Sequence, residues 1–168
     1  MTRRIPRFFA VLLVSGLSAA TAPAQISKSD QAKIASWPVS IESVNRFMTF
    51  EKGFGALKAS EPALAEARGM DMEKRVRVMS AIPAAVKLAG GSAANVADVV
   101  WTGAALHMLM LKMDPKRARA FDGALTSGQA MEPSPQQMIF AEAHRADLVR
   151  WRQELADIGN AQIAKYGR

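Results

Sequence analysis

The chain contains two histidines, and the first begins a methionine-rich segment. That segment reads His-Met-Leu-Met-Leu-Lys-Met from residue 107 to residue 113. Imidazole and thioether groups together are typical of sites that bind Cu(I). At about 100° per residue of helix, His107, Met110 and Met113 lie on neighbouring rows, whereas Met108 points elsewhere. The spacing predicts a copper site with at most three ligands, or, alternatively, methionines that fill gaps in a core.

The second histidine, His144, lies on an apolar seam of the C-terminal segment. An imidazole in that position is either a neutral, hydrogen-bonded core residue or a ligand. We therefore take His144 and Trp151 as candidate ligand-binding residues. Soluble b-type cytochromes of the four-helix kind hold haem between a methionine and a histidine, which makes Met48 and His144 candidate haem ligands. An alanine-rich core with few aromatic residues favours a closed core instead. The seam repeats in steps of three and four: Ala141, His144, Leu148, Trp151, Leu155 and Ile158.

The densest basic run is Lys116, Arg117 and Arg119. On a helix Lys116 and Arg119 share a face, which would contact phosphates of an anionic lipid surface or would simply be solvated.

The sequence contains no motif that is typical of an enzyme active site. There is no nucleophile-elbow sequence, no histidine pair at zinc-protease spacing and no glycine-rich phosphate loop. The absence of cysteine excludes thiolate catalysis, disulfides, Cys-ligated zinc and iron–sulfur clusters. We therefore predict no catalytic residue, and we expect a cofactor only if the copper or haem alternative holds.

The segments that carry these residues have a helical repeat almost throughout, which predicts an all-α fold. Ser40, Asp71, Ser92 and Ser134 are expected to cap helices, and glycines at 53 and 55 to kink the first long one. We expect 93–113 to be the central helix, because apolar residues occur nearly all round it. The expected helices before the central one are 41–59, 62–69 and a third that begins at 72, bends at 82–83 and ends at 90–91. The central helix is expected at 93–113, followed by helices at 115–125 and 135–164. The last of these is expected to pack in an antiparallel bundle.

Residues 1–24 predict export. Three arginines precede an apolar stretch of about 13 residues, too short for the roughly 20 that span a bilayer, and Ala22-Pro23-Ala24 matches a signal-peptidase site. The formal charge of +7 includes those arginines, so the remainder carries +4. We expect no transmembrane anchor and no nucleic-acid partner. The predicted organisation is a signal peptide at 1–24, a flexible segment with at most one short helix at 25–39, and one bundle of about four to six helices at 40–168.

Three short segments of the sequence resemble those of a group of small exported helical proteins of proteobacteria. They are Ser40-Ile41-Glu42-Ser43-Val44, Glu61-Pro62-Ala63-Leu64, and the segment 135–148, which has a proline, then a phenylalanine, then a histidine followed by Arg-Ala-Asp-Leu. This resemblance implies export and helicity and names no substrate. Together these patterns predict a non-enzymatic binding protein, periplasmic or secreted, in which a face or groove between helices engages an envelope component or another protein. A copper or haem carrier is the alternative.

Overall fold

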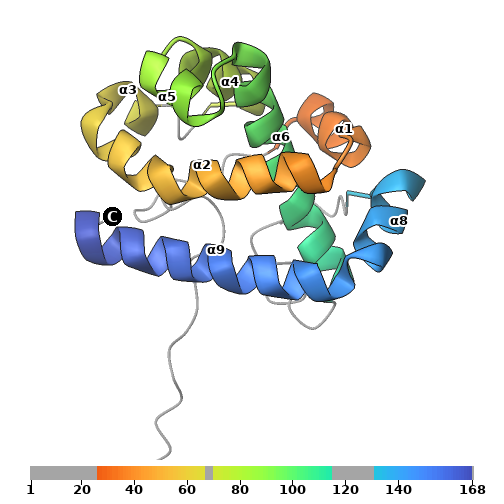
Figure 1. Ribbon diagram of the computed structural model, residues 1–168. Coiled ribbons are helices and arrows are strands. Elements are labelled where there is room, and N and C mark those ends of the chain that lie inside the picture. Colours follow the sequence, from red (N-terminus) through yellow and green to blue (C-terminus); the bar gives the residue numbers. More distant parts are fainter. Residues whose placement is uncertain (1–25, 67–69, 115–130, 168) are drawn as a thin grey trace, which may run out of the picture.

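The structure, a computed structural model, describes residues 26–66, 70–114 and 131–167. All regular elements in these ranges are helices, which confirms the all-α prediction for this part of the chain (Figure 1). The predicted signal peptide and the predicted helix 115–125 lie outside the described residues. Six of the eight described helices have nine residues or more: α1 (Lys28–Ser36), α2 (Ile41–Ser60), α4 (Met72–Ser80), α6 (Ala93–Met113), α8 (Pro135–Ala143) and α9 (Arg145–Tyr166); α3 (Pro62–Glu66) and α5 (Pro83–Leu88) are shorter.

Three long helices organise the packing. In Figure 1, α2 and α9 lie side by side and run in the same direction, and α6 crosses behind them. The seam on α9 was expected to belong to an antiparallel bundle, so this direction corrects the expected topology. Two polar contacts join α2 to α9. Lys52 forms an ion pair with Glu154 at 2.8 Å, and the Gln162 amide donates a hydrogen bond to the Glu51 carbonyl. Helices α3, α4 and α5 form a layer on the other side of α2.

The two glycines of α2 allow close approach of neighbouring helices and do not kink it. Helix α2 is continuous from residue 41 to residue 60, contrary to the expected kink. An ideal Cβ on Gly53 would lie 2.6 Å from a Leu88 methyl of α5. One on Gly55 would lie 2.6 Å from Gln162 Cγ of α9. At Gly55 this contact, more than backbone freedom, explains why the position lacks a side chain.

The expected caps form as side-chain hydrogen bonds. Ser40, Asp71, Ser92 and Ser134 each accept a hydrogen bond from the backbone N–H three residues later. Gly90 ends the α5 turn with a φ of 105°, and Gly91 follows with 95°, values that disfavour a residue with a side chain. These local signals set the helix boundaries.

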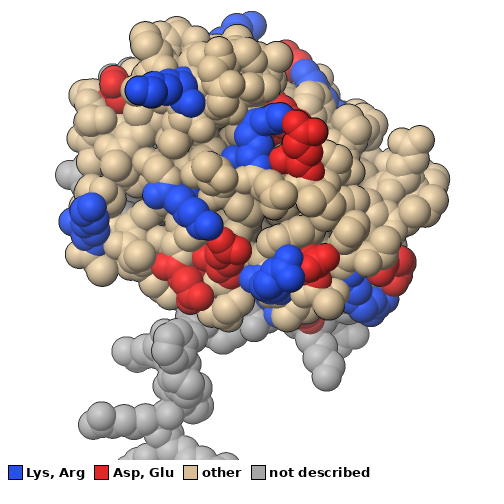
Figure 2. Space-filling model, viewed as in Figure 1, with Lys and Arg blue, Asp and Glu red and all other residues tan. Residues whose placement is uncertain are grey.

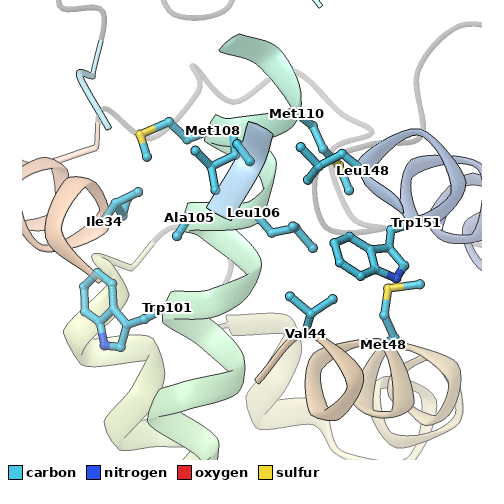
Figure 3. Packing of buried hydrophobic residues seen from close by; sticks show 12 residues of the cluster. Ile34, Val44, Met48, Trp101, Ala105, Leu106, Met108, Met110, Leu148 and Trp151 are labelled. Carbon is cyan, nitrogen blue, oxygen red and sulfur yellow. The ribbon is translucent and has the colours of Figure 1, made fainter. Parts of the chain in front are cut away.

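The core forms two clusters that meet along α6. One cluster surrounds Phe50 and Val99, and the other lies between Ile34, Leu106 and Trp151. Figure 3 shows Met108 beside Ile34 on one side of α6 and Met110 beside Leu148 on the other. The central position predicted for 93–113 is confirmed.

Helix α6 is also the one helix of the described ranges that is long and apolar enough to match a membrane span by length and composition. Half of its apolar window is buried inside the fold, as in the core helix of a globular protein.

The segment expected to be flexible contains α1, which packs on the rest of the fold. Ile34 is 1% exposed, and the Asp30 carboxylate accepts a hydrogen bond from the Met72 N–H at 3.1 Å. The short helix was expected, but this docking was not, because the contacts come from residues about 40 and 100 positions away.

Candidate functional site

A single residue, His144, separates α8 from α9. It was expected to lie within one helix running from 135 to 164, and the break corrects that expectation. The His144 backbone has φ −117° and ψ 28°, outside the α-helical region. Its N–H donates to the Phe140 carbonyl, and its own carbonyl accepts from Leu148 N–H at 2.8 Å. The backbone N–H and carbonyl of His144 therefore both keep hydrogen-bond partners at the break between α8 and α9.

A chain of polar contacts fixes the His144 ring. Its Nδ1 lies 3.0 Å from one Asp147 oxygen, and the Arg150 guanidinium donates to the other oxygen at 2.7 Å. A carboxylate only accepts, so Nδ1 is the donor in this pair. The neutral ring then presents Nε2 as an acceptor. Within the described ranges Nε2 forms no hydrogen bond, and the side chain is 29% exposed.

Two aromatic rings form the wall behind this imidazole. The Phe140 ring lies 4.6 Å from it and the Trp151 ring 6.2 Å, measured between ring centroids. Phe140 and Trp151 are stacked at 6.3 Å. Trp151 is only 4% exposed. The structure thus brings the two predicted ligand-binding residues together, and it makes Trp151 a support for His144 and not a surface group.

Two exposed apolar side chains lie five residues before and five residues after His144 in the chain. Ile139 on α8 is 70% exposed and Val149 on α9 is 55% exposed, the two highest values among the exposed large apolar residues described. Arg145 pairs with Glu142 at 2.8 Å across the break between the helices. We call the surface of Ile139, His144, Asp147, Val149 and Arg150 the α8–α9 corner.

Of the three predicted copper ligands on α6, Met110 is buried, and His107 and Met113 are half-buried. Burial lowers the pKa of His107 to about 4, so its ring is neutral at neutral pH, the form that binds metals. Met110 is 6% exposed and packs with Leu148, and Met113 is half-buried against the same cluster. Met108 lies on the opposite side of the helix, as the spacing predicted (Figure 3). The described residues contain no group of three His, Asp or Glu side chains positioned for a metal.

The predicted haem ligands are both neighbours of Trp151. Met48 is 4% exposed and lies beside the indole of Trp151 (Figure 3). The His144 ring lies 6.2 Å from the same indole, measured between ring centroids. A haem held by both residues would require the core at Trp151 to open.

Charged residues of both signs lie close to one another on the visible face. Figure 2 shows Lys and Arg next to Asp and Glu across this face. The Arg46 guanidinium, for example, bridges Glu42 at 2.9 Å and Asp98. The predicted lipid-binding residues Lys116, Arg117 and Arg119 lie outside the described residues.

Asp147 and Arg150 are the functional candidates that the sequence reasoning missed. The spacing His-x-x-Asp-x-x-Arg is the signal that would have found them, since residues three apart are neighbours on a helix. The i,i+4 spacing of Arg150 and Glu154 would by itself predict an ion pair between these two residues. In the structure Arg150 binds Asp147, and Glu154 binds Lys52 of α2.

Comparison of the chain with family models, curated proteins and solved structures gave no match. The assignment of a function therefore depends on the geometry of the corner.

Proposed function

We propose that the chain is an exported, non-enzymatic binding protein of the bacterial envelope that engages another protein through the α8–α9 corner. The observations that carry this proposal are the His144 ring, which Asp147 orients, and the high exposure of Ile139 and Val149 on the two helices that meet at His144. Protein interfaces combine apolar contacts with a few oriented hydrogen-bonding groups. His144 supplies the oriented group, because Asp147 holds its ring.

The location in the envelope is supported by the sequence of residues 1–24. The order of three arginines, a short apolar stretch and a small-x-small site is typical of a cleaved signal peptide. A partner would then be a protein or other component of the same compartment.

The corner's apolar side chains provide the test. Wild-type protein and its Ile139→Asp and Val149→Asp variants are immobilised and exposed to an envelope extract, and the retained proteins are quantified. Ile41→Asp is the matched control, because Ile41 is also an exposed isoleucine, at 40%, at the start of α2. All three substituted side chains are exposed, so the variants should fold.

We expect at least one protein to be retained by the wild type and by Ile41→Asp, and to fall about tenfold or more with either corner variant. A tenfold loss corresponds to about 1.4 kcal/mol of binding free energy. Retention that is equal in all four samples, or absent from all, would contradict binding at this corner. Binding only to vesicles of anionic phospholipid would replace the protein partner with a lipid surface.

A Cu(I) carrier is the second candidate, favoured by the neutral state of His107 on the helix that carries Met110 and Met113. The test is competition for Cu(I) against a chromogenic chelator, with His107→Gln as the variant and Met79→Leu as the control in the other core cluster. Loss of Cu(I) uptake in His107→Gln alone would support this candidate. No uptake by the wild type would remove it, and an absorption spectrum of the isolated protein without a Soret band would remove haem.

A further inference from the structure

Helix α1 is attached to two separate parts of the fold by polar contacts. At one end the Asp30 carboxylate accepts from Met72 N–H of α4, and Lys33 pairs with Glu73 at 3.2 Å. At the other end the Gln137 amide of α8 donates to the carbonyls of Ile34 and Trp37, both at 2.8 Å. Helix α1 therefore bridges α4 and α8.

The apolar contact of α1 is small by comparison. Ile34 is its one large apolar residue, and it packs near Met108 and Trp101 (Figure 3). Segments with few buried apolar contacts open locally at lower free energy than the core does. Helix α1 itself buries one large apolar residue, Ile34, and so belongs to this class, while Ile26, Trp37 and Val39 on either side of it are partly buried against the same cluster.

The linker after α1 contains an unsatisfied group. The indole Nε1 of Trp37 is buried and meets no hydrogen-bond partner within the described ranges. A buried donor without a partner has lost its water without compensation, and it regains water when the segment is released. The backbone is extended on both sides of Pro38, with ψ 127° at Trp37 and ψ 163° at Ser40, so rotation there separates α1 from α2.

Gln137 connects this segment with the corner. Its side chain is 2% exposed, and it also accepts from Ser134 N–H at the start of α8. The same helix carries Phe140, whose ring packs on His144. When α1 is docked, the start of α8 and the aromatic wall of the corner are held in one position.

We propose that α1 is a releasable latch, which undocks from α4, α6 and α8 as a unit while α2, α6 and α9 stay folded, and which positions α8 at the corner when docked. The effect on binding rests on the proposed function. The release itself is measured without a partner, so the two can fail separately.

The test is amide hydrogen exchange of α1 and α8 in the protein isolated from cells that export it. The chain has no cysteine, so a Lys33→Cys, Glu73→Cys double variant can be joined specifically by a short bis-maleimide across α1 and α4. We expect α1 amides of the unmodified protein to exchange at least tenfold faster than those of α6. Cross-linking should slow exchange in α1, and in the first turn of α8, by about tenfold.

The matched control is Lys52→Cys with Glu154→Cys, which joins α2 to α9 through another ion pair and should leave α1 exchange unchanged. Trp37→Phe, which removes the unsatisfied N–H, should slow α1 exchange several-fold. Equal protection of α1 and α6 in the unmodified protein would overturn the latch. Slowing in α1 without any change in α8 would overturn its connection to the corner.

Discussion

At Gly55 a missing β-carbon determines how closely α9 approaches α2. The Gln162 side chain occupies the place where a Cβ would lie, and its amide donates to the Glu51 carbonyl. We expect Gly55→Ala to lower the free energy of unfolding by about 1–2 kcal/mol, because the clash and the lost hydrogen bond outweigh the gain in helix propensity. Urea denaturation measures this.

Gly53→Ala is the control for that prediction. Its Cβ would meet a methyl of Leu88, which is half-buried and able to rotate, so the variant should stay within about 0.5 kcal/mol of the wild type. If both alanine variants were stabilising by similar amounts, the proposed contact between Gly55 and Gln162 would be wrong.

Glu51 makes stability depend on pH. Burial raises its pKa from 4.5 to about 7, and the positive charge of Lys58 opposes this only in part. Between those values the folded chain binds more protons than the unfolded chain, so stability falls as pH rises from about 4.5 to about 7. The loss amounts to at most about 3 kcal/mol.

Glu51→Gln is therefore expected to be more stable than the wild type at pH 8 and to show a flatter profile across that window. The comparison is with Glu42→Gln, an 84% exposed side chain of the same helix. Urea midpoints measured from pH 4 to pH 8 test the prediction, and parallel profiles for the wild type and Glu51→Gln would contradict it.

At the scale of the element, the start of α8 depends on Ser134. Its hydroxyl accepts from Gln137 N–H, while the Gln137 side chain accepts from Ser134 N–H, forming a capping box. We expect Ser134→Ala to cost about 1 kcal/mol of unfolding free energy. Ser36→Ala, which removes only an exposed bond to carbonyls of its own helix, should cost less than half as much. Equal losses would argue against the capping box.

The elements also show what the sequence predicts and what it does not. The caps at Ser40, Asp71, Ser92 and Ser134 were predictable, because each depends on a residue and the backbone three positions later. The break at His144 has no glycine or proline to mark it, so no local sequence signal predicts it. The docking of α1 through Gln137 and the pairing of Glu154 with Lys52 of α2 depend on residues far apart in the sequence.

The candidate site was predictable only in part for the same reason. His144 and Trp151 share a helical seam, so their proximity follows from the sequence. The exposure of Ile139 and Val149 does not, because it depends on which face of each helix the rest of the fold covers.

At the scale of the whole molecule, export predicts a shortened chain. We expect protein recovered from the periplasmic or secreted fraction to begin near Gln25, as shown by intact mass and N-terminal sequencing. Recovery of a chain that retains residues 1–24 would contradict export by a cleaved signal.

The α8–α9 corner is most directly tested by photo-crosslinking in intact cells. A photoreactive phenylalanine analogue is placed at Ile139 in one strain and at Ile41 in another, and adducts are identified by mass. The account predicts a defined adduct with one envelope protein from position 139 that is missing from position 41. The same adducts from both positions, or none from position 139, would contradict it.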